Sequence, residues 1–221
     1  MNKMKIELKG SDNYFVNEAF NVLRTNVQFC GADKKVIGIT SCRENEGKST
    51  IALHLAASFA ELGKKVLFVD ADLRKSVVAS RNTDATVSGG LSEVLTGQTT
   101  MQEAFWETQY PGLHVLFSGK FPPNPVDLLS GKQFRKFIEA AKAVYDYVIV
   151  DTPPIGEVID AAAVAVACDG MLLIAANAKV HARPVKNAAE QLSKSGTPIL
   201  GIVRNFVSDK KRRYYYASKQ Q

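Results

Sequence analysis

The segment GITSCRENEGKSTIA, residues 38–52, decides the fold of this chain. It continues a short run of apolar, β-branched residues typical of a buried strand, and it leads into an apolar helix. Its centre matches the closing G-K-[ST] of a phosphate-binding loop, in which backbone N–H groups and the start of a helix bind an anion. We therefore expect nucleotide binding by the loop residues Asn45, Glu46, Gly47, Lys48, Ser49 and Thr50.

The loop departs from the usual pattern G-x-x-x-x-G-K-[ST] at two positions. Cys42 stands at the first glycine position, and Asn45 stands where a further glycine is common. Asparagine tolerates the left-handed backbone conformation better than other non-glycine residues, so we expect the loop to close. Lys48 would then reach the β- and γ-phosphates, and the Ser49 hydroxyl would be a ligand for Mg²⁺.

Short apolar runs alternate with helical patterns along the rest of the chain. Strands are predicted at 35–40, 65–70, 113–118, 147–151, 171–175 and 199–205, and helices at 13–28, 48–62, 91–95, 101–106, 131–145 and 184–195. This alternation predicts an α/β fold, with a doubly wound, mostly parallel sheet and helices on both faces. We expect Met1–Gly10 to be loose, Asp12 to cap the first helix, and Ser76–Gly90 to be a mobile loop.

Composition excludes several classes of protein. The chain has 221 residues, 46% of them hydrophobic and 23% charged, which is ordinary for a globular protein and excludes disorder, collagen and coiled coil. We expect no membrane span and no signal peptide, since no apolar run is long enough. An odd count of three cysteines without a secretion signal suggests reduced thiols and a cytoplasmic location.

The net charge of +6 is concentrated at one end of the chain. Residues 210–221 hold five lysines and arginines and no acidic residue, so the rest of the chain carries only +1. A broad basic face for nucleic acid is therefore not expected. The same segment contains Tyr214, Tyr215 and Tyr216 in succession, a pattern that no packed helix or strand explains. We expect a folded domain over residues 1–208 and a basic, tyrosine-rich flexible tail over 209–221.

Aspartates end two of the predicted strands. Asp70 ends one strand, with Asp72 two residues on, and Asp151 ends another. In open α/β sheets ligands bind at the carboxyl ends of the strands, so these carboxylates should converge on the phosphate loop, where Mg²⁺ is their natural partner. Asp151 fits a Walker B role, and Asp70 or Asp72 could be a general base. Turn formation alone would explain one such aspartate, but poorly explains three.

These motifs together resemble the bacterial tyrosine kinases. The phosphate loop is followed by VLFVDADLR at 66–74 and by VIVDTPP at 148–154, in the order found in that family. Four further segments are similar to family motifs: EAFNVLRTN at 18–26, FPPNP at 121–125 with Leu128 and Leu129, Asp160-Ala161, and GIVRN at 201–205. The resemblance covers nearly the whole chain.

The resemblance implies an ATP- and Mg²⁺-dependent autokinase that phosphorylates its C-terminal tyrosines between protomers and controls capsular or extracellular polysaccharide. Its Gram-positive form works at the inner face of the membrane through a transmembrane adaptor of the chain-length-determinant type, with a cognate tyrosine phosphatase. Two self-association residues, Glu18 and Arg24, match, while Asn21 replaces the arginine between them. The resemblance also implies that Lys48 and Ser49 bind phosphate and metal, that Asp70 acts as the general base, and that Asp72 and Asp151 order the metal. It further implies that Asn205 contacts the adenine. The implied phosphoacceptors are Tyr214, Tyr215 and Tyr216.

Two other functions share the phosphate loop and the sheet. One is a dimeric ATPase switch of the partition or division-site positioning type, which would hydrolyse ATP without labelling tyrosine. The other is a non-catalytic, ATP-sensing subunit of a polysaccharide export machine. The double acidic motif and the tyrosine tail favour the kinase over both.

Overall fold

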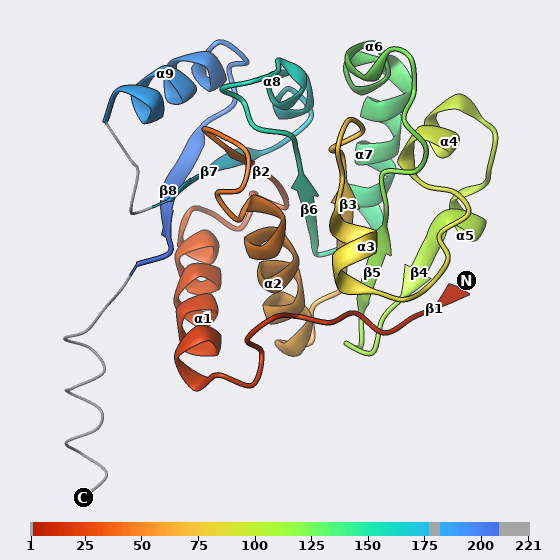
Figure 1. Ribbon diagram of the computed structural model, residues 1–221, viewed down its shortest axis with the longest axis horizontal. Coiled ribbons are helices and arrows are strands. Elements are labelled where there is room, and N and C mark those ends of the chain that lie inside the picture. Colours follow the sequence, from red (N-terminus) through yellow and green to blue (C-terminus); the bar gives the residue numbers. More distant parts are fainter. Residues whose placement is uncertain (1, 177–181, 208–221) are drawn as a thin grey trace, which may run out of the picture.

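A single twisted sheet organises the molecule (Figure 1). The computed structural model describes residues 2–176 and 182–207, and within them the strand order is β1-β4-β5-β3-β6-β2-β7-β8. Every neighbouring pair is parallel except β4 and β5. The strands are β1 (Asn2–Lys3), β2 (Val36–Ser41), β3 (Val66–Asp70), β4 (Phe105–Glu107), β5 (Leu113–Leu116), β6 (Tyr147–Asp151), β7 (Gly170–Ala176) and β8 (Ile199–Asn205).

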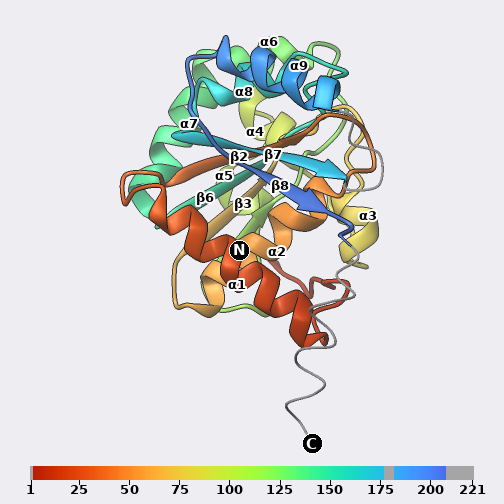
Figure 2. The same ribbon diagram turned by 90° about the vertical axis from the view of Figure 1, so that its left-hand side faces the viewer.

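Helices cover both faces of this sheet (Figure 2). Alternate side chains of the central strands point to opposite faces, which separates the apolar core into layers. One layer packs under α1 and α2, while α4 and α7, and next to them α8 and α9, cover the other face. The helices are α1 (Tyr14–Phe29), α2 (Lys48–Glu61), α3 (Val78–Asn82), α4 (Leu91–Thr96), α5 (Met101–Ala104), α6 (Pro125–Ser130), α7 (Lys132–Val144), α8 (Asp160–Ala165) and α9 (Ala182–Ser193).

The predicted α/β architecture is confirmed, and all six predicted strands are present with starts and ends within two residues of those expected. The largest difference is in the third strand, which ends at Leu116 instead of residue 118. The expectation that Met1–Gly10 is loose is wrong for the described part of that segment. Asn2 and Lys3 pair with β4, and the following apolar residues Met4, Ile6 and Leu8 are buried at alternate positions. This spacing of two is that of an extended segment with one face against the core.

Three local expectations also need correction. Asn13, not Asp12, caps the first helix, because its side-chain oxygen accepts the Phe15 N–H at 2.9 Å. The segment expected to be a mobile loop contains the short helix α3. The helix predicted at 101–106 ends at Ala104, and its last residues instead form β4, which pairs antiparallel with β5. The short helix α8 was not anticipated.

The parallel arrangement brings the functional segments to one edge of the sheet. The carboxyl end of β2 leads into the phosphate loop, while β3 and β6 lead into the two acidic motifs. In the register of these strands Asp70 lies beside Asp151. In the described part of the chain, no helix has the length and apolarity needed to cross a membrane.

Candidate active site

The phosphate loop connects β2 to α2 through two left-handed residues. Asn45 has φ 61° and Gly47 has φ 86°, and Gly47 is the residue that caps the start of α2. The sequence predicts this conformation for Asn45, since asparagine is among the few residues that adopt it readily. The loop therefore closes with asparagine in place of a glycine.

Glu46 ties the loop to itself and to the neighbouring strand. Its carboxylate accepts the N–H of Arg43 at 2.9 Å and that of Ala176, at the end of β7, at 3.4 Å. Its carbonyl oxygen accepts the side-chain amide of Asn205, at the end of β8, at 2.9 Å. Sequence reasoning included Glu46 as a loop member but gave no sign of these contacts, which depend on the order of the strands.

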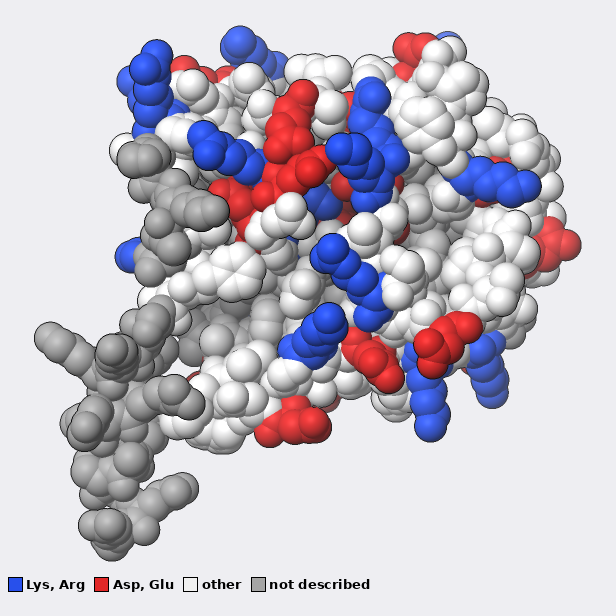
Figure 3. Space-filling view, in the orientation of Figure 1, with Lys and Arg blue, Asp and Glu red and all other residues white. Residues whose placement is uncertain are grey.

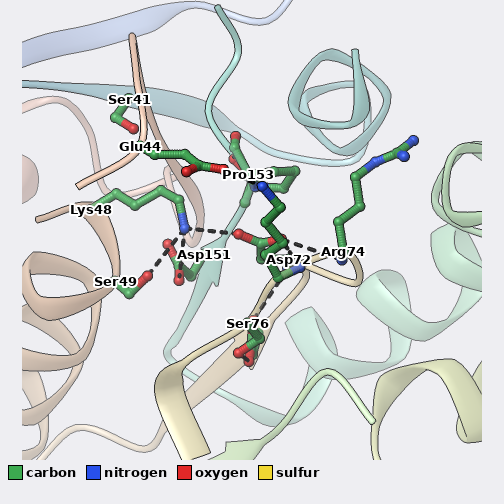
Figure 4. A network of polar contacts seen from close by, with 12 residues as sticks. Ser41, Glu44, Lys48, Ser49, Asp72, Arg74, Ser76, Asp151 and Pro153 are labelled. Carbon is green, nitrogen blue, oxygen red and sulfur yellow. Dashed lines mark hydrogen bonds and ion pairs between the residues drawn. The ribbon is translucent and has the colours of Figure 1, made fainter. Parts of the chain in front are cut away.

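Lys48 is the centre of the polar network in Figure 4. Its ammonium lies 3.1 Å from Asp72 Oδ2, 3.8 Å from Asp151 Oδ2 and 3.2 Å from Ser49 Oγ. Burial alone would lower the pKa of Lys48, but the negative charges of Asp151, Asp72 and Asp70 outweigh it and raise that pKa above its usual value. The lysine therefore remains a cation throughout the physiological pH range.

Asp151 is fully buried at the base of the site. Neither of its carboxylate oxygens has a hydrogen-bond partner among the described residues. Burial raises the pKa of Asp151 to about 6, although the Lys48 charge opposes this shift. Buried carboxylate oxygens that accept no hydrogen bond are costly, and Lys48 lies 3.8 Å away, so this position is suited to a cation bound more closely.

Asp70, also fully buried, has a different set of partners. Its Oδ2 accepts a short hydrogen bond from Ser76 Oγ, and its Oδ1 accepts the Asp72 N–H at 3.2 Å. Burial, and then the neighbouring charge of Asp151, raise the pKa of Asp70 to about 7, against the opposing hydrogen bond from Ser76. A carboxyl group with that pKa exchanges a proton readily near neutral pH.

Asp72 is oriented by the backbone that follows it. Its Oδ1 accepts the N–H groups of Arg74 and Lys75 at 3.3 and 3.1 Å, and its Oδ2 faces Lys48. Asp72 and Asp151 thus share one lysine. Asp70 is turned toward Ser76, so the three carboxylates meet at one edge but do not all point at the same atom.

Three further contacts surround this network, and the sequence did not predict them. Arg74 Nε lies 3.0 Å from Asp160 Oδ1, a fully buried carboxylate at the start of α8. On the surface, Lys75 pairs with Glu44 at 3.0 Å, and the Glu44 N–H donates to Glu157 at 2.9 Å. Figure 3 shows acidic and basic side chains gathered side by side on this face. In the sequence, only the family motif Asp160-Ala161 marks Asp160 as a residue of interest.

The residues expected in self-association lie away from the site. Arg24 is half-buried between α1 and α2, where it donates to the Ser58 carbonyl oxygen at 2.7 Å, while Glu18 is exposed on α1. The expected phosphoacceptors, Tyr214, Tyr215 and Tyr216, lie outside the described residues.

The donor atoms at the site fit Mg²⁺, which keeps water and phosphate ligands, better than a metal ion that is bound by protein side chains alone. Within residues 2–176 and 182–207, no group of three or more His, Cys, Asp and Glu side chains could hold a metal ion. The available donors are oxygens of Ser49, Asp72 and Asp151, next to the phosphate loop. Mg²⁺ is usually bound through one or two carboxylates together with water and phosphate oxygens, so these residues fit it.

Comparison with known proteins agrees with this geometry. A family model described as "AAA domain" matches residues 34–195. The chain is 45% identical over 197 residues to tyrosine-protein kinase CpsD of Streptococcus agalactiae serotype Ia, covering 89% of this chain and 85% of that protein. The chain belongs to the bacterial tyrosine kinase family. The kinase domain of Escherichia coli tyrosine kinase ETK superposes with a TM-score of 0.87 at 33% identity, covering 94% of this chain and 82% of that structure.

The bacterial tyrosine kinase fold is shared with other ATPases. The septum site-determining protein MinD of Pyrococcus horikoshii, complexed with Mg-ADP, superposes with a TM-score of 0.65 over 80% of this chain and 72% of that one. At 24% identity this likeness shows the fold alone. Family membership therefore favours the tyrosine kinase over the positioning ATPase and the non-catalytic subunit.

Proposed function

We propose that this kinase transfers the γ-phosphoryl group of ATP, with Mg²⁺, to tyrosines in residues 214–216 of a second copy of the chain. The observation that carries the proposal is the cluster of Asp70, Asp72 and Asp151 around Lys48. Phosphoryl transfer needs cations at the phosphates and a group that accepts the proton of the attacking hydroxyl. This cluster supplies a lysine, two candidate metal ligands and a buried carboxyl group of raised pKa.

Each residue has a separate role in the proposal. Lys48 binds the β- and γ-phosphates, and Ser49, Asp72 and Asp151 hold Mg²⁺, which neutralises phosphate charge. Asp70 accepts the proton of the tyrosine hydroxyl, a role that its raised pKa supports because an effective general base titrates near the working pH. Asn205 binds the adenine.

The tail proposal rests on charge and sequence. Residues 210–221 carry five basic side chains beside the three tyrosines, and each phosphate added there would contribute about −1.5 to −2 of charge. Full phosphorylation would thus cancel roughly all of the positive charge of the tail. We propose that this change regulates capsular or extracellular polysaccharide synthesis, with a transmembrane adaptor of the chain-length-determinant type holding the kinase at the inner face of the membrane and a tyrosine phosphatase resetting it.

The test is phosphotyrosine formation by the purified full chain. We expect ATP and Mg²⁺ to give a phosphotyrosine signal that mass spectrometry maps to residues 214–216. The Lys48→Met variant should lose this signal, and a variant with all three tyrosines changed to phenylalanine should lose it while binding ATP normally. The adaptor's cytoplasmic segment is added in parallel, because the family's Gram-positive kinases are expected to need it.

Three results would contradict the proposal in different ways. ATP binding without turnover, with or without the adaptor segment, would favour the ATP-sensing subunit. ATP hydrolysis without labelled tyrosine would favour the ATPase switch. Full labelling of the triple phenylalanine variant would move the phosphoacceptor role to another tyrosine, such as Tyr14 or Tyr110.

A further inference from the structure

Phe206 has a backbone conformation and an exposure that are both unfavourable for its residue type. It directly follows β8, its φ is 55°, and 61% of the residue is exposed to solvent. The left-handed region is rare for bulky side chains, because their Cβ atom crowds the backbone. Neither local backbone preference nor burial of the ring explains a phenylalanine at this position.

The ring of Phe206 lies against the phosphate loop. A Cβ atom built on Gly47 would be 3.6 Å from Phe206 Cζ and 2.1 Å from Asn205 Nδ2. Figure 2 shows the end of β8 beside α2, which starts from this glycine. The aromatic ring is therefore placed at the loop where a nucleotide's phosphates bind, and a side chain at Gly47 would collide with the Asn205 amide but only touch the Phe206 ring.

Asn205 holds Phe206 in this position. The Asn205 amide donates to the Glu46 carbonyl oxygen at 2.9 Å, and its side-chain oxygen accepts the Phe206 N–H at 2.8 Å. One side chain thus connects the phosphate loop to the backbone of Phe206. Strain that persists because surrounding contacts enforce it is characteristic of binding sites.

We propose that Phe206 is a binding residue whose ring stacks on the purine base of the nucleotide. This inference rests on the proposed ATP-dependent function and adds to it the residue that binds the base face. Base–aromatic stacking tolerates any base, because each base has a π-face, and it contributes a substantial share of affinity where it occurs. Phe206 would then add affinity for the base, and Asn205 would contact its edge.

The test compares nucleotide binding with binding of inorganic tripolyphosphate, which lacks the base. In Phe206→Ala we expect the Kd for ATP to rise about 10-fold while that for tripolyphosphate stays unchanged. Phe206→Tyr should bind ATP as the parent does. Phe29→Ala is the matched control, because Phe29 is an exposed aromatic residue at the far end of α1 and its loss should change neither Kd.

Two further variants separate binding from folding. Phe206→Gly removes the ring and also suits the left-handed backbone, so it should melt no lower than the parent and still lose affinity for ATP. Phe206→Trp should show fluorescence quenching on adding ATP but not on adding tripolyphosphate. The parent, with only Trp106 on β4, provides the background signal.

The outcomes distinguish this inference from the proposed function. An unchanged Kd for ATP in Phe206→Ala, with the parent binding ATP and labelling tyrosine, would overturn the stacking role alone. An equal change in both Kd values would show instead that the ring shapes or obstructs the phosphate loop. A parent that binds tripolyphosphate but not ATP would contradict both proposals.

Discussion

Arg74 neutralises a carboxylate that the fold buries completely. Its Nε lies 3.0 Å from Asp160 Oδ1, and the other oxygen of Asp160 has no hydrogen-bond partner among the described residues. The pair joins the loop after β3 to the start of α8 across the edge of the sheet. Its energetic role is mainly to avoid leaving one buried charge alone.

Removing Arg74 should therefore destabilise the protein strongly. We expect Arg74→Ala to lower the free energy of unfolding by about 3 kcal/mol, because Asp160 is fully buried and would be left with an uncompensated charge, while Arg74 itself is partly exposed. The double variant Arg74→Ala, Asp160→Ala should recover part of this loss, as judged by urea unfolding in a double-mutant cycle. Arg81→Ala, on the exposed end of α3, is the control. Equal losses in the single and double variants would argue against the pair.

Asp70 and Asp151 should fail in different ways when neutralised. Asp70→Asn removes the proposed base, so we expect kcat to fall about 100-fold with little change in the Kd for ATP. Asp151→Asn removes a proposed metal ligand and should raise the Mg²⁺ concentration needed for half-maximal activity. Steady-state kinetics and ATP titrations, each at several Mg²⁺ concentrations, would separate the two effects. The same response from both variants would contradict the division of roles.

The raised pKa of Asp70 predicts how the free energy of unfolding depends on pH. Between the usual aspartate pKa near 3.8 and the folded value of about 7, the folded protein binds more protons here than the unfolded chain. Stability contributed by this group is therefore lost as pH rises through that window. Measured without nucleotide or metal, Asp70→Asn should gain stability over the parent at pH 8, on the order of 4 kcal/mol, and much less at pH 4.5. A gain that does not depend on pH would contradict the shift.

Arg24 should act on folding as well as on assembly. Because its guanidinium donates to the Ser58 carbonyl at 2.7 Å, Arg24→Ala should cost about 1–2 kcal/mol of stability. Glu18→Ala, at an exposed position, should leave stability unchanged, so any change in its oligomeric state would come from a lost surface contact and not from unfolding. Sedimentation velocity and urea unfolding on both variants test this. A stable, fully monomeric Arg24→Ala protein would assign Arg24 to assembly alone.

The first residues of the chain should contribute to stability despite their polar composition. Ile6 is 3% exposed and packs in the core cluster under α2, so Ile6→Ala should cost about 3 kcal/mol of unfolding free energy. Lys5→Ala, at the exposed position next to it, should change stability by less than about 0.5 kcal/mol. Equal, small effects from both would mean that the segment is not held to the body.

The central parallel strands are predictable because each is buried on both faces and so reads as a continuous apolar run. The edge elements are not. β1 is two residues long and pairs with β4, which is far away in the sequence, while β4 is only three residues long and pairs with the next strand, β5. Choosing Asn13 over its neighbour Asp12 as the helix cap depends on backbone angles that composition does not set.

The candidate site divides in the same way. Lys48, Ser49 and the three aspartates follow from local motifs and from the rule that the strand ends meet at one edge. Other features depend on contacts between segments that are far apart in the sequence. These are the direction in which Asp70 points, the ion pair of Arg74 with Asp160, and the hydrogen bonds of Glu46 to β7 and β8. The position of Phe206 against Gly47 has the same origin.

Lys48 pairs with Asp72 and Asp151, so binding of a phosphate by Lys48 and of a metal ion by the two aspartates should affect each other. An anion that draws the lysine ammonium away from Asp72 leaves both Asp72 and Asp151 without their cation, which increases their affinity for a divalent ion. By reciprocity, a divalent ion at the carboxylates frees the lysine for the anion. The two ligands should therefore bind with positive cooperativity beyond their association in solution, and a phosphate compound that does not chelate magnesium should still bind more tightly when magnesium is present.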